Sequence, residues 1–231
     1  MSWYTNTAFI HASIGTLALA TFWIAGMSKK GSPIHKAAGK IYLLAMTGII
    51  ISALPLSLSM LLNKSPAGGS FFLYLLVITS TSVWCSWRAI RDKRDWAKYT
   101  GAVYKIFMLL NILSAISIVL VALLLPNDIQ IILMAFSSIG VINAVHMFRF
   151  SRTSPQDPRW WMSEHLSAMI GNGVATHIAF LSIGLPKLLP MLSGPVLQNM
   201  AWLGPLTLSI FAGIYLKRKY VPKRLNQGAP Q

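Results

Sequence analysis

Long apolar segments alternate with short polar connections through the whole chain. A helix that crosses a bilayer needs about 20 predominantly apolar residues, and seven segments of this chain approach that length. The pattern therefore predicts an all-α fold with one domain, residues 1–231, built as a bundle of seven transmembrane helices. The predicted spans lie near residues 7–27, 41–62, 70–90, 104–125, 129–148, 160–185 and 199–216.

The basic residues are unevenly divided between the connections. Alternate connections and the C-terminal tail hold 18 of the 20 lysines and arginines, and the other connections hold only Lys64 and Lys187. The connection around Pro126–Asp128 has no basic residue. Cytoplasmic loops of membrane proteins carry the excess of lysine and arginine. This division predicts a multi-pass protein of a bacterial-type plasma membrane, with its N-terminus outside and its C-terminus in the cytoplasm.

Composition narrows the class of protein further. Of the 231 residues, 55% are hydrophobic and only 11% charged, whereas soluble domains carry about 25% charged residues. A formal net charge of +15 would fit nucleic-acid binding. The basic residues lie between apolar segments, however, so the lipid bilayer is the expected partner and nucleic acid is not. The single cysteine, Cys85, excludes an intramolecular disulfide.

Two short motifs resemble a known family. The run KKGSPIHKAAGKIYLLAM, preceded by His11, and the later run WWMSEHLSAMIGNG are similar to a bacterial family of predicted membrane proteins. That family is catalogued as domain of unknown function 2306. The resemblance covers nearly the whole chain, and it implies a multi-span membrane protein without implying a reaction.

The sixth predicted span carries two histidines, His165 and His177. Histidine inside a membrane helix is rare, and it marks a functional-site hypothesis by default. The two imidazoles lie 12 residues apart in sequence, which is roughly 18 Å along a helix at 1.5 Å per residue. One histidine is therefore expected near each leaflet of the membrane.

The predicted topology suggests a pair of histidines at each membrane level. His165 with His146 would form an inner pair, and His177 with His11 an outer pair. Membrane b-type cytochromes hold each haem between two imidazoles, so these four residues are candidate ligands of haem b in an electron-transfer protein. The sixth span resembles the histidine helices of the cytochrome b561 type. Its gap of 12 residues departs from theirs, so the two pairs would need different partner helices.

A second interpretation is a zinc site. His35, His146 and His165 all belong to the predicted cytoplasmic half, and three histidines can hold Zn²⁺ with an open position. Glu164, the only glutamate of the chain, would then serve as the general base of a membrane-embedded metal-dependent hydrolase.

The third interpretation gives the histidines a structural role. They would form hydrogen bonds across helices with Ser, Thr and Asn residues, such as Asn111, Asn143 and Asn172. The protein would then be a transporter of a neutral substrate or an assembly factor. Haem-linked electron transfer is the preferred specific hypothesis, and the sequence leaves open whether the chain is an enzyme. It also leaves open the protein partners and the oligomeric state.

Overall fold

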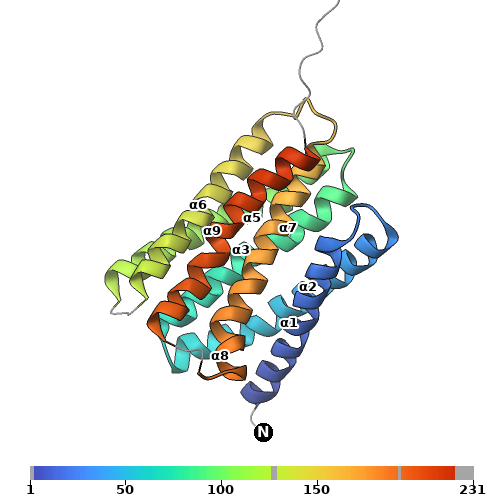
Figure 1. Ribbon diagram of the computed structural model, residues 1–231. Coiled ribbons are helices and arrows are strands. Elements are labelled where there is room, and N and C mark those ends of the chain that lie inside the picture. The colour runs from blue at the N-terminus through green and yellow to red at the C-terminus, as the bar shows by residue number, and fades with distance from the viewer. Residues whose placement is uncertain (1–2, 126–128, 192–193, 222–231) are drawn as a thin grey trace, which may run out of the picture.

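The computed structural model describes residues 3–125, 129–191 and 194–221, and within them the chain is all-helical (Figure 1). The loop residues 126–128 and the tail with Lys223 and Arg224 lie outside the described residues. The elements are α1 (Trp3–Met27), α2 (Pro33–Asn63), α3 (Pro66–Arg91), α4 (Trp96–Tyr99), α5 (Ala102–Leu124), α6 (Gln130–Arg152), α7 (Trp160–Ala179), the π-helix η1 (Phe180–Gly184), α8 (Leu185–Leu188) and α9 (Pro195–Tyr220).

Seven helical segments are long and apolar enough to cross a membrane, which confirms the predicted number of spans among the described residues. The segments are longer than the apolar runs suggested. Helix α2, for example, begins at Pro33, eight residues before the predicted start at 41. The Ser32 hydroxyl accepts a hydrogen bond from the His35 amide at 3.2 Å, so a capped polar turn precedes the apolar part of this helix.

Helices α3 and α7 form the centre of the bundle. The α1–α2 hairpin packs on one side of them, the α5–α6 hairpin packs against α3 on another side, and α9 packs on α7 (Figure 1). Large apolar side chains such as Phe9, Ile131 and Leu208 are 70–79% exposed on the periphery. In a membrane these side chains would face lipid, while the polar groups described below lie between the helices.

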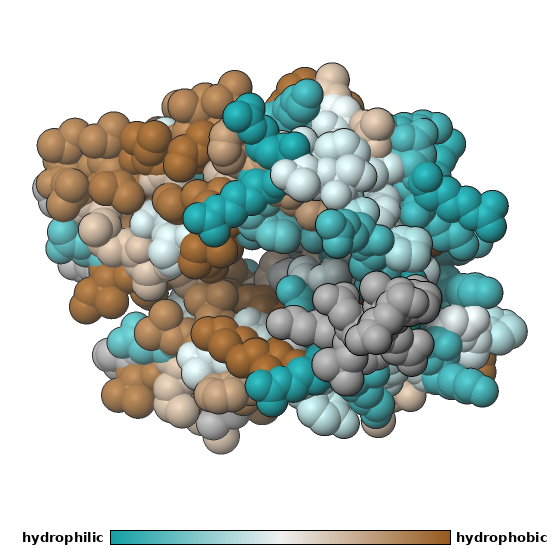
Figure 2. Space-filling view, turned by 90° about the horizontal axis from the view of Figure 1, so that it is seen from above, coloured by the Kyte–Doolittle hydropathy of each residue, from teal (hydrophilic) through white to brown (hydrophobic). Residues whose placement is uncertain are grey.

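The connections rich in lysine and arginine all lie at one end of the bundle, which we call the basic end. They are the α1–α2 loop, the α3–α5 connection with α4, the α6–α7 loop and the end of α9 (Figure 1). Figure 2 shows the same division, with hydrophilic side chains gathered over this end and hydrophobic ones on the flank of the bundle. Charge and apolar surface are therefore separated along the helix axes, as an integral membrane protein requires.

A tyrosine side chain of α3 forms hydrogen bonds with two backbone groups of α6. The Tyr74 hydroxyl donates to the Phe136 carbonyl at 2.6 Å and accepts from the Gly140 amide at 2.9 Å. A Cβ on Gly140 would lie 3.0 Å from the tyrosine oxygen and 2.9 Å from the Asn111 carbonyl. The glycine therefore allows the close approach of three helices at this level.

The sixth span begins at the predicted residue 160 but ends beyond the predicted residue 185. Helix α7 begins at Trp160, after a turn in which the Asp157 carboxylate accepts a hydrogen bond from the Arg159 amide at 2.8 Å. The helical path does not stop at Pro186 but continues through η1 and α8 to Leu188. Proline lacks an amide N–H, and the wider π turn before it accommodates that gap in the hydrogen-bond ladder.

Candidate functional site

Helix α7 carries polar side chains on two sides. Two adjacent residues, Glu164 and His165, begin these two sets. Glu164 and His165 are neighbours in sequence, so their side chains leave the helix roughly 100° apart. Glu164 points towards α4 and α6, where it contacts Tyr99 and His146. His165 points towards α3, where it contacts the backbone of Ser86. These directions create two separate polar sites.

The first site, which we call the carboxyl cluster, consists of Tyr99, His146 and Glu164. Glu164 is only 8% exposed. One carboxylate oxygen lies 3.0 Å from His146 Nε2 of α6, and the other accepts a hydrogen bond from the Tyr99 hydroxyl of α4 at 3.4 Å. The only glutamate of the chain therefore has two partners from two other elements, as a buried carboxylate needs.

Aromatic side chains enclose the tyrosine of this cluster. Tyr99 is fully buried, and its ring centroid lies 5.2 Å from that of Tyr104 and 5.0 Å from that of Trp160. Burial raises the pKa of Tyr99 well above its usual range, and the neighbouring Cys85 and Glu164 raise it further. Tyr99 therefore keeps its proton and acts as a hydrogen-bond donor to the carboxylate.

The histidine of the cluster reaches the molecular surface. The His146 side chain is 54% exposed, whereas that of Glu164 is 9% exposed. His146 also lines an open pocket of about 480 Å³ at the basic end, together with Arg149, Phe150 and residues 153–156. The imidazole therefore links a buried carboxylate to the outside of the bundle, and a proton could pass between them along one hydrogen bond.

The second site, which we call the α7 seam, is a line of buried and half-buried polar groups between α2, α3 and α7. It consists of Tyr42, Ser86, His165, Asn172 and Thr176. His165 Nδ1 lies 2.9 Å from the Ser86 carbonyl, and the Ser86 hydroxyl accepts from Asn172 Nδ2 at 3.0 Å. The Thr176 hydroxyl donates to the Asn172 carbonyl and lies 2.9 Å from the Tyr42 hydroxyl. The seam runs from His165 to Thr176, roughly 16 Å along the helix.

Two acceptors near the seam have no hydrogen-bond partner among the described residues. They are Asn172 Oδ1 and His177 Nε2, and both atoms are buried. His177 turns its other nitrogen, Nδ1, to the Gly173 carbonyl at 2.7 Å. Its ring packs edge-on against Phe22 and Trp23 of α1. Unpaired buried polar atoms are rare in native structures, so these two positions offer acceptors to water or to a bound solute.

The structure does not bring together the inner histidine pair that the sequence suggested. His146 contacts Glu164 on the α6 side of α7, while His165 contacts Ser86 on the α3 side. In addition, His146 uses Nε2 for the carboxylate. The side chains of Glu164 and His165 diverge around the helix axis, which directs the two histidine contacts to different sides of α7.

The outer pair is also separated. His11 Nδ1 lies 2.8 Å from the Ser52 hydroxyl of α2. His177 contacts α1 at Phe22, 11 residues further along that helix, which is roughly 16 Å away. Two imidazoles on opposite sides of one iron atom must lie much closer than that. The residues of neither expected pair form a bis-histidine haem site.

The three histidines expected at a zinc site have separate partners. His35 Nδ1 lies 2.9 Å from the Ala25 carbonyl, His146 contacts Glu164, and His165 contacts Ser86. Among residues 3–125, 129–191 and 194–221, no group of three His, Cys, Asp or Glu side chains is placed to hold a metal ion. The geometry thus gives no support to the zinc-dependent hydrolase.

Comparisons with known proteins do not assign the chain to a class. No family model, no curated protein and no solved structure matches it. The resemblance of its two motifs to domain of unknown function 2306 stays a prediction. The candidate sites therefore rest on the geometry alone.

Sequence reasoning found the histidines but not their partners. Tyr99 lies in a basic connection between two spans, and nothing in its sequence context indicates that it is buried. Ser86, Thr176 and Tyr42 lie within apolar segments where polar residues are common. One sequence feature could have identified the carboxyl cluster. A lone glutamate near the start of a membrane helix needs a proton or a partner, and His146 is a histidine at a similar predicted depth.

Proposed function

We propose that the chain is a multi-pass protein of a bacterial plasma membrane with the basic end in the cytoplasm. The N-terminus then lies outside and the C-terminus inside. The division of 18 against 2 basic residues supports this orientation. The resemblance to domain of unknown function 2306 also fits it. Reporter fusions after Gly68 should be active outside the cell and fusions after Asp92 inside, and the reverse pattern would contradict the orientation.

Within this membrane protein, we propose a proton-linked transport function centred on Glu164. The observation that carries the proposal is a buried carboxylate whose hydrogen-bond partner, His146, is 54% exposed. Ionisable groups inside membrane proteins commonly form proton relays. Histidine is the side chain whose ordinary pKa lies close to neutral pH. Exchange between cytoplasm and Glu164 would therefore pass through this imidazole.

The solute would be small, neutral and able to donate hydrogen bonds. The two acceptors without partners, Asn172 Oδ1 and His177 Nε2, support this chemistry. The described spans offer no carboxylate beside these atoms that would select a cation. A solute bound there would lie further from the basic end than Glu164 does, since α7 runs away from that end.

The test is proton transfer by the purified protein in liposomes, followed with an enclosed pH-sensitive dye. Glu164→Gln keeps one acceptor oxygen, which the Tyr99 hydroxyl can use, but it cannot exchange a proton. We expect the rate of proton transfer to fall by about 100-fold, the lower range for loss of a general acid–base group. Asp95→Asn is the matched control, because Asp95 caps the short α4 at the same end.

Two results would contradict the proposal. The first is wild-type liposomes that show no more proton transfer than empty ones across a range of candidate neutral solutes. The second is a Glu164→Gln variant that folds normally and keeps the wild-type rate. The melting temperature of each variant, measured in the same detergent, separates loss of function from loss of fold.

Haem-linked electron transfer is a second candidate, and a different observation favours it. His165 and His177 each hold Nδ1 against a backbone carbonyl, at 2.9 and 2.7 Å. Histidines that bind metals are oriented in this way, which leaves Nε2 available as the ligand. Haem would supply one-electron chemistry, but each histidine would need a second axial ligand other than the one expected from the sequence.

The visible spectrum of protein made in haem-replete and zinc-replete cells tests this candidate. A sharp haem band that is lost in His165→Ala or His177→Ala supports electron transfer. A colourless protein with stoichiometric zinc supports a hydrolase instead. A colourless, metal-free protein leaves the transport function.

A further inference from the structure

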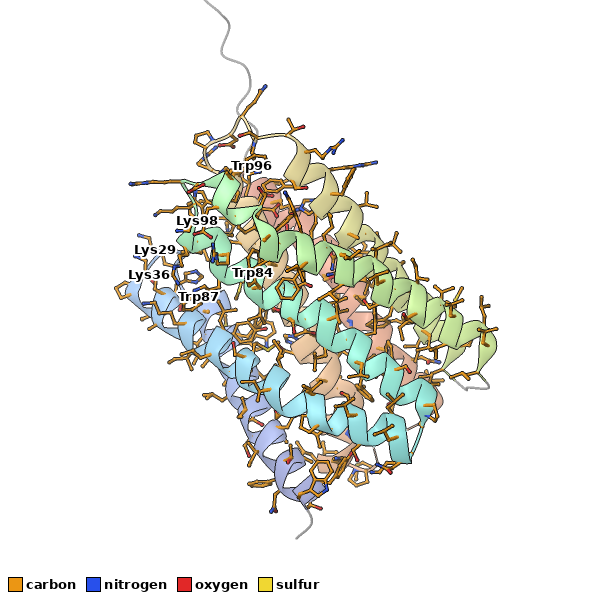
Figure 3. The ribbon with its side chains drawn as sticks, turned by 180° about the vertical axis from the view of Figure 1, so that it is seen from behind. Lys29, Lys36, Trp84, Trp87, Trp96 and Lys98 are labelled. Carbon is orange, nitrogen blue, oxygen red and sulfur yellow. The ribbon has the colours of Figure 1, made fainter. Side chains whose placement is uncertain are left out.

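Three lysines at the basic end have no ion pair or cation–π contact among the described residues. Lys29 belongs to the α1–α2 loop, Lys36 to the first turns of α2 and Lys98 to α4, and all three are exposed (Figure 3). None of them has an ion pair or a cation–π contact within the part of the chain that the structure describes. The neighbouring Lys30 differs, because its ammonium group donates to the Gly26 carbonyl at 2.6 Å.

Among the described residues, no carboxylate forms an ion pair with these lysines. Each acidic side chain within residues 3–125, 129–191 and 194–221 already has an internal partner. This end therefore carries an excess of positive charge that a negative group from outside the protein would neutralise. The internal pairs are Asp92 with Arg88, Asp157 with Arg159, Glu164 with His146, and Asp95 with the backbone amide of Lys98.

An exposed apolar surface on α3 lies beside the lysines. Trp87 is 40% exposed and Ile90 is 43% exposed. Helix α3 packs directly against α2, which carries Lys36, and Figure 3 shows Trp87 at the same end as the three lysines. Trp87 lies four residues before the end of α3 at Arg91, roughly 6 Å along the axis. Tryptophan is enriched at this depth, where headgroups meet acyl chains.

We propose that Lys29, Lys36, Lys98 and Trp87 form a binding site for a phospholipid with a net negative headgroup. The ammonium groups would contact the headgroup phosphate, and the indole with Ile90 would contact the glycerol and upper acyl region. A free phosphate would satisfy the lysines but would leave the apolar half of the site empty. Basic clusters on the cytoplasmic side of membrane proteins bind anionic lipids in this way.

The test uses bromine-labelled lipids, which quench the fluorescence of a nearby tryptophan. The protein is placed in phosphatidylcholine vesicles that contain a small fraction of brominated phosphatidylglycerol or, separately, brominated phosphatidylcholine. Subtracting the signal of Trp87→Phe isolates the contribution of Trp87. We expect brominated phosphatidylglycerol to quench Trp87 more strongly. Each lysine should contribute roughly fivefold to the preference, and all three on the order of a hundredfold.

The triple variant Lys29→Gln/Lys36→Gln/Lys98→Gln should lose the preference. The matched control is Lys217→Gln/Arg218→Gln/Lys219→Gln, which removes the same charge from the same end but from α9, the helix that packs on α7. Unchanged melting temperatures show that both variants are folded. Equal quenching by the two lipids in the wild type overturns the proposal, as does a preference lost equally in both triple variants. Displacement by inorganic phosphate, but not by chloride at equal ionic strength, would show a free-anion site instead and also overturn it.

Discussion

The carboxyl cluster and the α7 seam begin at neighbouring residues, yet they differ in what they reach. From Glu164 the hydrogen bonds lead outward to His146, which is 54% exposed. From His165 they lead inward, past Ser86, to Asn172 and Thr176. A rotation of roughly 100° between adjacent helical positions separates the two directions. Position around a helix, more than depth along it, thus decides which polar groups exchange with the surroundings.

Substitutions in the carboxyl cluster and in the α7 seam should therefore have different effects. The cluster holds the buried carboxylate, so changes there should alter proton exchange as well as stability. The seam consists mostly of uncharged groups between packed helices, so changes there should alter stability and solute contact. The following predictions test this division, from the largest expected effect to the smallest.

Gly173→Leu should have the largest effect, because it forces α1 away from the seam. A Cβ on Gly173 would lie 2.4 Å from the ring of Phe22. Overpacking of this kind costs about 1–3 kcal/mol, and a full leucine side chain should reach the upper value. Thermal unfolding in detergent measures the loss. Gly15→Leu is the control, since nothing lies within 4 Å of its Cβ position, and similar melting of the two variants would contradict the packing described for α1 and α7.

Glu164→Leu should destabilise the protein more than Glu164→Gln does. Leucine leaves the buried Tyr99 hydroxyl without its acceptor, and an unsatisfied buried donor costs about 1–3 kcal/mol. Glutamine keeps an acceptor oxygen, so it should lose proton transfer while keeping most of the stability. Chemical unfolding of the two variants, compared with their proton-transfer rates, checks this separation. If both variants lost stability equally, Tyr99 would not depend on the carboxylate oxygen.

Asn172→Leu should have a smaller effect on stability. It removes one hydrogen bond to the Ser86 hydroxyl, and hydrogen bonds between membrane helices contribute about 0.6 kcal/mol on average. Ser86 keeps its bond to the Ser82 carbonyl at 2.7 Å. The same variant should abolish binding of a solute that uses Asn172 Oδ1. A loss of stability as large as that of Gly173→Leu would show that the seam is mainly a packing element.

The smallest expected effect is a loss of stability at alkaline pH that depends on Tyr99. Burial raises the pKa of Tyr99 in the folded protein. Tyrosine in the unfolded chain titrates near about pH 10, so above that pH the unfolded state loses its proton first. The free energy of unfolding should therefore fall as the pH rises above about 10. Tyr99→Phe should reduce this fall, and melting temperatures measured on both sides of that pH provide the check.

The fold could be predicted well because each membrane-spanning helix is indicated by a single continuous stretch of the sequence. Seven apolar segments of sufficient length were visible directly, and the described part of the chain has seven helices that are long and apolar enough to span a membrane. The sites were harder to predict. The histidines could be assigned a depth, but His146 and His165 were expected to meet, and rotation about α7 directs them apart. That rotation, and the burial of Tyr99 in a basic connection, depend on how several helices pack, which no single segment of the sequence records.

The Tyr74 hydroxyl that bridges Phe136 and Gly140 has a consequence for biogenesis. In lipid there is no water to satisfy a backbone group that lacks a partner, and each such group costs several kcal/mol. At this level the Tyr74 hydroxyl of α3 adds two hydrogen bonds to the backbone of α6. Helix α3 precedes α6 in the chain, so insertion in chain order would bring the tyrosine into the membrane first. We therefore expect Tyr74 to serve as a docking point when α6 arrives.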